Sequence, residues 1–243
     1  MNYAIVIPAR LNSTRLPNKP LIQINGIPML LLTIRNCLKA TNKNNIYVAT
    51  ESKIIKKMCN ENKIQCVITS SKCLTGTDRV AEFAKKIKKD LYINVQGDEP
   101  LMPPNDIKKV INYAKKHPAK ILNGYTKISD KKNFFSEHIP KLVFDKKNDL
   151  MYMSRSPIPF NKKKNFIFGY RQVCIYSFPR KMLLIFAKRK KKTIIENTED
   201  IEILRFLEMG YKVKMLKLSN MSISVDTKKD KIKVENILKK KLK

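Results

Sequence analysis

Three cations follow the first apolar run of the sequence, with no acidic residue among them. Arg10, Arg15 and Lys19 lie between the strand-like run YAIVI and the next apolar segment. Arginine offers forked donors to phosphate oxygens, and lysine offers a point charge. A loop of this kind is suited to a triphosphate, and surface cations of a basic protein are the alternative interpretation. The sequence has no GxxxxGK[ST] motif, so a P-loop is excluded.

Two aspartates follow apolar runs at distant points of the chain. Asp98 in VQGDEPL comes after the run LYINV, and Asp226 in SVDT comes after SISV. Mg²⁺ prefers carboxylate and phosphate oxygens, so two such carboxylates suit a magnesium site. We predict that they lie within about 6 Å of each other, close enough to share one ion. An acidic turn for Asp98 and a turn or N-cap role for Asp226 are the alternatives.

The motif TGTDR at 75–79 joins a small loop to a helical pattern. Backbone N–H groups at the start of a helix can bind a phosphate or read the edge of a base. The alternative is an ordinary helix start, for which we expect Thr77 to be the N-cap residue.

Apolar runs alternate with helical periodicity over the first half of the chain, and this pattern predicts the scaffold for these motifs. The expected strands lie at 3–9, 45–50, 64–69 and the start of 90–101. The expected helices lie at 28–41, 52–63, 76–89 and 103–117. Such alternation favours an α/β fold with a mainly parallel sheet covered by helices. Ligands of such sheets bind outside the carboxyl ends of the strands, where the cationic loop and Asp98 are expected.

The alternation of strand-like runs and helical patterns ends at about residue 121. Strand-like segments with a hairpin at DKKND predict a smaller antiparallel lobe at about 121–180, inserted into a single domain of residues 1–243. A helix is expected at 196–210, ending at Gly210. The segments YKVKMLKL and SISVDTKKD are expected to return to the sheet.

The composition narrows the class of protein. The formal charge of +31 is spread along the chain rather than gathered in a patch, so we interpret it mainly as solvated lysine faces, including AKRKKKT at 187–193. A basic nucleic-acid-binding protein stays a remote alternative. No apolar run approaches a membrane span, and the first run is too short for a signal peptide. We expect a cytoplasmic protein without a membrane segment.

The motifs IPARLNSTRLPNKPL, IYVAT, TGTDR, VQGDEPL, YMSRSPIPF and VDT occur in this order. Together they resemble the 3-deoxy-manno-octulosonate cytidylyltransferases over essentially the whole chain. The resemblance implies a Rossmann-like nucleotidyltransferase fold with a smaller antiparallel dimerisation lobe, and a homodimer. It implies an enzyme that uses Mg²⁺ to couple CTP to the acidic keto-sugar Kdo, giving CMP-Kdo and pyrophosphate for lipopolysaccharide biosynthesis.

The resemblance also implies roles for individual residues. Its catalytic positions are Arg10, Lys19, Asp98 and Asp226, the two aspartates being the metal ligands. Its nucleotide-binding positions are Ser13, Arg15, Thr75, Gly76, Thr77 and Arg79. Its sugar-binding positions are Gln96, Arg155, Gln172, Tyr176, Glu196 and Glu199.

The chain departs from the family pattern at several positions. Gln172 stands where the family usually has His, Glu51 stands where it often has Asp, and Asn197 stands where it often has His. Because Gln172 and Asn197 lie on the acceptor side, they bear on the sugar more than on the phosphate chemistry. A cytidylyltransferase for another acidic sugar, such as 8-amino-Kdo, is therefore the main alternative.

Overall fold

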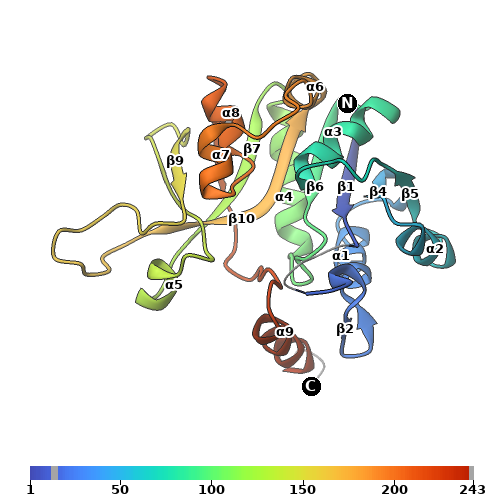
Figure 1. Ribbon diagram of the computed structural model, residues 1–243, viewed down its shortest axis with the longest axis horizontal. Coiled ribbons are helices and arrows are strands. Elements are labelled where there is room, and N and C mark those ends of the chain that lie inside the picture. Colours follow the sequence, from blue (N-terminus) through green and yellow to red (C-terminus); the bar gives the residue numbers. More distant parts are fainter. Residues whose placement is uncertain (12–15, 241–243) are drawn as a thin grey trace.

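The first apolar run forms β1 (Tyr3–Ala9), a buried strand in the middle of a mixed sheet (Figure 1). The computed structural model describes residues 1–11 and 16–240. Within them, the main path of the sheet runs in the order β11-β7-β10-β6-β1-β4-β5. The bounds of the other strands on this path are β4 (Ile46–Thr50), β5 (Gln65–Ile68), β6 (Leu91–Val95), β7 (Ile121–Lys127), β10 (Tyr170–Pro179) and β11 (Val213–Lys217).

The sheet is mainly parallel, as the sequence predicts. Strands β6, β1, β4 and β5 pair in parallel, as do β7 and β11, while β10 runs antiparallel between β6 and β7. In the register of β1 with β6, Val6 is opposite Asn94. The two strands therefore end at the same edge of the sheet, which brings the segments after Ala9 and Val95 side by side.

Helices cover both faces of the sheet, because each carries one apolar face. Helices α1, α2 and α4 pack on one face with the odd-numbered β1 residues Ile5 and Ile7, while α3, α6 and α8 pack on the other with Ala4 and Val6. The bounds of these helices are α1 (Met29–Leu38), α2 (Lys53–Glu61), α3 (Gly76–Lys86), α4 (Pro104–Lys116), α6 (Arg180–Phe186) and α8 (Leu204–Glu208).

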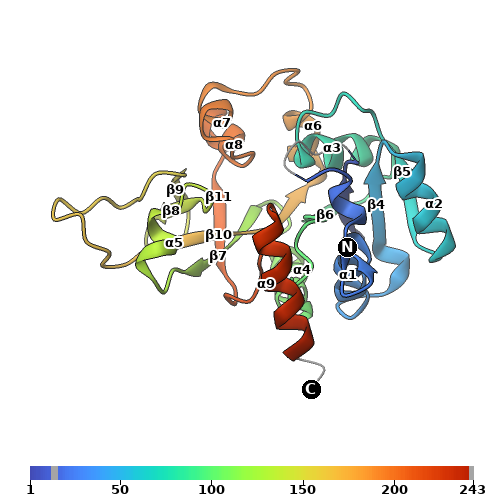
Figure 2. The ribbon, with the colours of Figure 1, turned by 60° about the horizontal axis from the view of Figure 1, so that its bottom comes forward.

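A hairpin and the loop after it project to one side of the main sheet (Figures 1 and 2). The hairpin pairs β8 (Lys141–Phe144) with β9 (Leu150–Ser154) through the predicted DKKND turn, and α5 (Lys131–Phe135) precedes it. Strand β8 also pairs with β10. The first and last strands of the predicted lobe, β7 and β10, lie in the main sheet, so the projecting part is the chain between them.

The helix predicted at 196–210 is wrong as a single element. The structure has α7 (Ile194–Glu199) and α8, separated by Asp200 in the left-handed conformation at φ 50° and ψ 49°. The break allows Glu202 to reach α3, and Arg205 to pair with Glu196. These tertiary contacts override a helical periodicity that is otherwise continuous.

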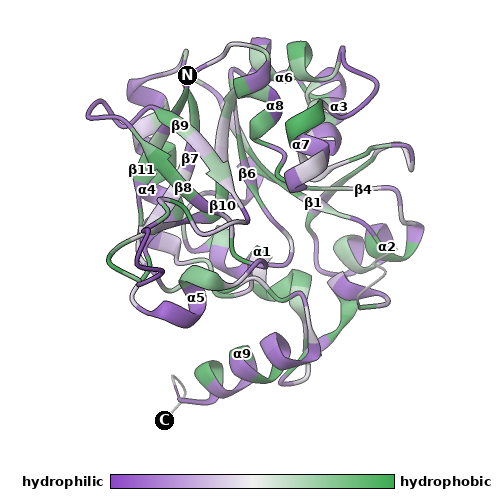
Figure 3. Ribbon diagram, turned by 60° about the vertical axis from the view of Figure 1, so that its left-hand side comes forward, coloured by the Kyte–Doolittle hydropathy of each residue, from purple (hydrophilic) through white to green (hydrophobic). Residues whose placement is uncertain are grey.

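The segment SISVD is extended but joins no strand, contrary to expectation. Its contacts with the rest of the fold include hydrogen bonds from Val225 N to Asp98 O at 3.0 Å, from Ser222 Oγ to Glu99, and from Arg171 Nη2 to Ser222 O at 3.1 Å. Helix α9 (Lys228–Lys240) follows, with hydrophilic and hydrophobic residues along its length (Figure 3), and its Val234 packs in a small cluster with Val225 and Ile24. The short elements near this cluster are η1 (Lys19–Leu21), β2 (Gln23–Ile24) and β3 (Ile27–Pro28), and η2 (Lys43–Asn45) precedes β4.

Candidate active site

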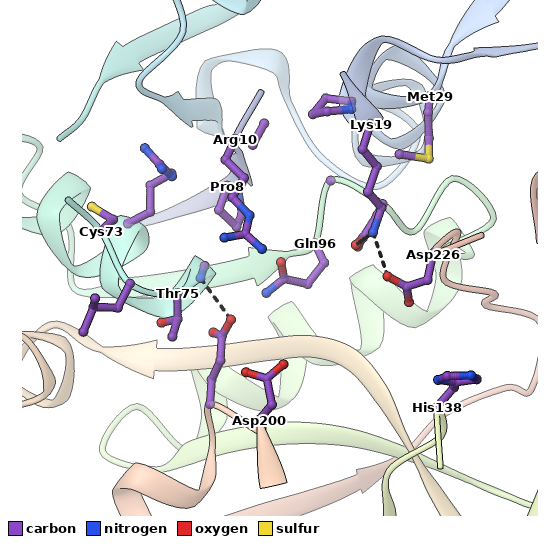
Figure 4. Close-up of a pocket in the computed structure, with 18 of the residues that line it drawn as sticks. Pro8, Arg10, Lys19, Met29, Cys73, Thr75, Gln96, His138, Asp200 and Asp226 are labelled. Atoms are coloured by element: carbon purple, nitrogen blue, oxygen red, sulfur yellow. Dashed lines mark hydrogen bonds and ion pairs between the residues drawn. The ribbon is translucent and has the colours of Figure 1, made fainter. Parts of the chain in front are cut away.

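A cleft of about 640 Å³ opens at the carboxyl ends of β1 and β6. Figure 4 shows its two ends, with Lys19 and Asp226 at one end and Thr75 at the other, and Gln96 between them. The chain segments that meet here are far apart in sequence, as expected for the ligand-binding edge of an open α/β sheet. Its polar lining residues are Arg10, Lys19, Thr75, Arg79, Gln96, Asp98, Glu137, His138, Arg155, Lys192, Asp200, Glu202 and Asp226.

Lys19 lies between the two predicted metal-binding aspartates. Its Nζ is 2.5 Å from Asp98 Oδ2 and 3.0 Å from Asp226 Oδ1. The two carboxylate oxygens are therefore no farther apart than the sum of these distances, which meets the predicted limit of about 6 Å. Burial by itself lowers the pKa of Lys19, but the two carboxylates outweigh it and hold this pKa above its usual value.

Three different elements supply this triad. Asp98 follows the end of β6, Lys19 begins η1, and Asp226 ends the extended segment that Val225 ties to the backbone of Asp98. The hydrogen bond between the backbones of Val225 and Asp98 sets the spacing of the two carboxylates. Asp226 is therefore held by side-chain and backbone contacts, among them its pair with Lys19, and not by strand pairing.

The donor set at this end fits a magnesium ion. Mg²⁺ is usually held by one or two carboxylates, with waters and substrate phosphates completing its octahedron. Asp98 and Asp226 supply two carboxylates, and over the described ranges no group of three or more His, Cys, Asp or Glu side chains forms a fuller cage. The arrangement suits an ion that arrives with a phosphorylated substrate rather than a permanent structural metal.

Arg10 lines the same cleft, directly after the end of β1. The implied nucleotide contacts Ser13 and Arg15 lie outside the described residues, so they stay predictions. Of the three cations that open the sequence, Arg10 and Lys19 are thus placed at the cleft.

The TGTDR motif forms the start of α3, but its N-cap is Thr75 and not Thr77. Thr75 Oγ1 accepts a hydrogen bond from Asp78 N at 3.1 Å. Thr77 is buried, and its N and Oγ1 both donate to Glu202 Oε2, at 2.8 and 2.5 Å. The T-x-x-D spacing was the signal for the correct cap.

Gly76 allows the start of α3 to pack closely against the end of β6. A Cβ atom on Gly76 would lie 3.0 Å from Gln96 Nε2 and 3.4 Å from Glu202 Oε1. Gly76 N donates to that same Glu202 oxygen at 2.9 Å. A side chain at position 76 would therefore displace two residues that line the cleft.

Arg79 is buried and holds the loop after β1. Its Nη2 lies 2.7 Å from Glu51 Oε2, and Glu51 Oε1 accepts from Leu11 N at 2.9 Å. The glutamate that replaces the more common family aspartate thus links α3 to the start of the cationic loop. Arg79 lines the cleft, but its guanidinium is largely occupied by Glu51 and by Thr69 Oγ1, which lies 2.7 Å from Nη1.

Two of the implied sugar contacts, Gln96 and Arg155, line the cleft. Arg155 is held on three sides by backbone carbonyls. Its Nε donates to Glu199 O at 2.6 Å, Nη1 to Glu137 O at 3.1 Å, and Nη2 to Asp200 O at 3.2 Å. Arg155 therefore joins the end of β9 to the turn at 136–138 and to the break between α7 and α8.

The structure gives the other four implied sugar contacts different partners. None of Gln172, Tyr176, Glu196 and Glu199 is among the described residues that line the cleft. Buried Gln172 donates to Asn123 Oδ1 at 2.9 Å and to Tyr176 Oη at 3.2 Å. Burial holds the pKa of Tyr176 well above its usual value.

Both glutamates serve internal contacts. Glu196 pairs with buried Arg205 at 2.6 Å. Glu199 accepts from Arg155 N at 2.8 Å and from Ser154 Oγ at 2.6 Å. These side chains hold the frame around Arg155, and a direct sugar contact from them stays a prediction.

Five polar residues in the described lining of the cleft have no site role in the sequence analysis: Glu137, His138, Lys192, Asp200 and Glu202. Burial raises the pKa of Glu202, although its bonds from Thr77 and Gly76 act in the opposite direction. The acidic spacing of Glu196, Glu199 and Glu202 is visible in the sequence, but nothing local shows that α7 ends at Asp200 and that Glu202 turns toward α3.

The chain matches a family model described as cytidylyltransferase over residues 4–223. It is 35% identical to the 3-deoxy-manno-octulosonate cytidylyltransferase of Chlorobium phaeovibrioides, covering 99% of this chain and 98% of that protein. It is 36% identical to an 8-amino-3,8-dideoxy-manno-octulosonate cytidylyltransferase of Shewanella baltica, covering 98% and 99%.

A solved structure gives a further comparison. A CMP:2-keto-3-deoxy-manno-octonic acid synthetase complexed with CTP superposes with a TM-score of 0.91 at 28% identity, covering 99% of this chain and 100% of that one. In the described part of the chain, no helix is long and apolar enough to cross a membrane.

Proposed function

The chain belongs to the cytidylyltransferase family, and we propose that it couples CTP to 3-deoxy-manno-octulosonate (Kdo), giving CMP-Kdo and pyrophosphate. The observation that carries this function is the placement of Lys19 between Asp98 and Asp226, beside Arg10, at the edge where β1 and β6 end. Cations and paired carboxylates together are what a triphosphate and its metal ion require.

The cationic side chains bind and orient the triphosphate. Lys19 and Arg10 neutralise the phosphate oxygens and stabilise the charge that develops on pyrophosphate as it leaves. The anomeric hydroxyl of the acceptor attacks the α-phosphorus, so the acceptor has to lie between the phosphate end and the Arg155 end of the cleft. Holding both reactants in line supplies much of the rate enhancement.

We further propose that Asp98 and Asp226 hold Mg²⁺ in the working complex. The bound ion would neutralise phosphate charge and lower the pKa of the attacking hydroxyl. Lys19 then exchanges its two carboxylate partners for phosphate oxygens as the substrate arrives. Two carboxylates on separate segments and a cation able to change partners support this assignment.

A second acceptor, 8-amino-Kdo, is the alternative favoured by a specific observation. Relatives named for that sugar match this chain as closely as relatives named for Kdo, at 36% and 35% identity. Gln172, in place of the usual family His, lies in the acceptor half of the molecule and contacts Tyr176. It can act on the sugar only indirectly, through the residues it positions.

The projecting hairpin region supports a homodimer. Phe160, Ile167 and Phe168 follow β9 and are 64%, 71% and 46% exposed. Large apolar side chains gathered on one projecting segment are typical of an interface. Since the reaction consumes CTP, we propose that the dimer works in the cytoplasm.

Pyrophosphate release tests this function. The purified protein is given CTP or UTP, with Kdo, 8-amino-Kdo or no acceptor, in Mg²⁺ or in excess chelator. We expect release that requires CTP, a sugar acid and Mg²⁺, with UTP at least about tenfold poorer because a buried partner of the cytosine amino group would be left unpaired. Absence of release with every sugar acid contradicts the function, and a preference for 8-amino-Kdo at equal concentration selects the second acceptor.

A further inference from the structure

One lysine of the run AKRKKKT lines the cleft, unlike its neighbours. Residues 187–193 connect α6 to α7, and Lys190 and Lys191 are exposed. Lys192 has a side chain that is only 23% exposed and is part of the cleft wall. Lys190 and Lys191 are thus solvated, whereas the side chain of Lys192 lies in the wall of the cleft.

The partner of Lys192 is a carboxylate at the break between two helices. Lys192 Nζ donates to Asp200 Oδ1 at 2.7 Å. The other carboxylate oxygen of Asp200 lies 3.9 Å from Arg155 Nη2. One carboxylate thus lies between two cations in the cleft, and Figure 4 shows Asp200 among the stick side chains of the wall.

The Asp200 carboxylate lies at the end of α7 and is mostly exposed. Asp200 is in the left-handed conformation at φ 50° and its side chain is 69% exposed. An exposed carboxylate gains little from an ion pair and gives it up at small cost. Asp200 is the C-cap residue of α7, a place where Asn and Asp adopt the left-handed conformation readily.

The two cations differ in how much of their bonding capacity is already used. Arg155 spends Nε, Nη1 and Nη2 on the carbonyls of Glu199, Glu137 and Asp200. Lys192 has three donors, and across the described residues its one recorded hydrogen bond goes to Asp200. Arg155 has five N–H groups, so in the described part of the chain each cation keeps two for an incoming anion. Lys192 is held by one hydrogen bond to an exposed carboxylate and can turn toward that anion, whereas Arg155 is the fixed charge beside it.

We propose that Lys192, next to Arg155, binds the carboxylate of the acceptor sugar acid, and that Asp200 occupies this position until the acceptor arrives. The inference rests on the proposed function, because it identifies the subsite for the acid group of that acceptor. Exchange of one carboxylate for another leaves both cations paired throughout. The displaced Asp200 side chain, already largely exposed, turns to solvent.

The first test removes the cation. Lys192→Met keeps the apolar stem, and Lys191→Met is the matched control from the same run. We expect the KM for the sugar acid to rise about tenfold or more in Lys192→Met, since hydrogen bonds to charged groups are worth about 1.5–3 kcal/mol. The KM for CTP and kcat should stay within about twofold, and Lys191→Met should resemble wild type. Lys192→Arg, which restores the charge, should recover most of the affinity.

The second test changes the anion. An acceptor analogue with a carboxamide in place of the carboxylate should bind more weakly to wild type than the acid does. Lys192→Met should bind this analogue as well as wild type does. Asp200→Asn should lower the KM for the sugar acid two- to fivefold, because the competing charge is removed. A structural role for Lys192 would instead weaken the acid and the amide equally.

The outcomes separate this inference from the function beneath it. Turnover with an unchanged acceptor KM in Lys192→Met contradicts the carboxylate subsite and leaves the cytidylyltransferase function intact. A rise in the KM for CTP in place of the acceptor contradicts it too, and would move Lys192 to the phosphates. Absence of turnover with any sugar acid contradicts the proposed function and, with it, this inference.

Discussion

The two ends of the cleft are built in different ways. At the end proposed for the phosphates, Asp98 follows the buried parallel strand β6, and Lys19 pairs with it and with Asp226. At the acceptor end, Arg155 and Asp200 lie on a projecting hairpin and on a break between two short helices. Strand ends are fixed by the whole sheet, while a helix break is fixed by a few side chains. The acceptor end is therefore the more adaptable half of the site.

A buried ion network holds that helix break in place. The guanidinium of Arg205 pairs with Glu196 at 2.6 Å and with Asp78 at 2.8 Å, and it lies 3.7 Å from the centre of the Phe186 ring. This network docks α7 and α8 onto the start of α3. Glu202 is thereby brought within hydrogen-bonding distance of Thr77.

The largest expected effect is on this network. Arg205→Met should lower the free energy of unfolding by about 3–5 kcal/mol, because buried Glu196 and largely buried Asp78 lose their cation. Urea denaturation followed by circular dichroism measures it. Lys212→Met is the control, since the side chain of Lys212 is 83% exposed and 4.0 Å from Asp149, and it should change stability by less than about 0.5 kcal/mol.

A second variant tests the cause. Adding Glu196→Gln to Arg205→Met should recover part of the lost stability, because one unpaired buried charge is removed. If the double variant is as unstable as the two losses added together, packing against Phe186 rather than charge accounts for the effect.

The second prediction concerns the phosphate end. Asp98→Asn should lower kcat about 100-fold or more with a small loss of stability, because a charge that acts in the transition state is removed. Initial rates of pyrophosphate release, with unfolding curves beside them, separate the two effects. Asp90→Asn is the control: Asp90 is exposed, directly precedes β6 and is not among the described residues that line the cleft, so this variant should keep wild-type rates. If Asp98→Asn lost as much stability as Arg205→Met, Asp98 would be as important for the stability of the fold as the Arg205 network is.

The positions of the residues at the phosphate end can be predicted from the sequence better than those at the acceptor end, because they follow strands that local patterns predict. Apolar runs predict β1 and β6, and parallel strands end at one edge, so Arg10 and Asp98 are placed by pattern alone. The apolar run before Asp226 points to it as well, although that run joins no strand in the structure. The family itself, and the fold with its hairpin at DKKND, are confirmed.

The acceptor end depends on contacts that no local pattern carries. The capping box of Thr193 and Glu196 marks the true start of α7, but nothing local marks its end at Asp200. Two ion pairs of Arg205 with residues on other elements decide where the helix breaks. The family motif predicts a sugar contact for Glu196, and only the structure shows that Glu196 pairs with buried Arg205.

The third prediction concerns a buried lysine beneath Arg155. Lys141 is fully buried, and its Nζ donates to the backbone oxygens of Ser136 and Arg155. Burial, with the positive charge of Arg155, lowers the pKa of Lys141 from 10.5 to about 8. Lys141→Met should lower the free energy of unfolding at pH 7.5 by about 1–3 kcal/mol, because both carbonyls lose their donor.

The sign of the pH dependence follows from the lowered pKa. Between about pH 8 and pH 10.5 the folded protein releases this proton before the unfolded chain does, so stability rises with pH over that window. The stability difference between wild type and Lys141→Met should therefore grow from pH 7.5 to pH 10, measured by urea denaturation at both. A difference that stays constant would mean that Lys141 titrates normally and that the acceptor end is more open to water than its burial indicates.

The smallest expected effect compares the same backbone strain at two glycines, one after α8 and one in the turn between β2 and β3. Gly210, just after α8, has φ +79°, and Gly26, in the turn between β2 and β3, has φ +77°. A Cβ atom on either glycine meets nothing within 4 Å in the described structure. Alanine at each position should therefore cost only the strain of a left-handed residue, about 1 kcal/mol.

The two alanine variants should nevertheless differ in kinetics. Gly210→Ala strains the end of α8, which carries Arg205, so it should raise the KM for the sugar acid about two- to threefold and leave the KM for CTP unchanged. Gly26→Ala lies in the turn of the separate two-stranded sheet of β2 and β3 and is not among the described residues that line the cleft, so it should leave both KM values within error. Equal stability losses with these unequal kinetics would show that the acceptor end transmits small strains to its ligand. Equal kinetics in the two variants would show instead that strain at the end of α8 does not reach the sugar-acid site.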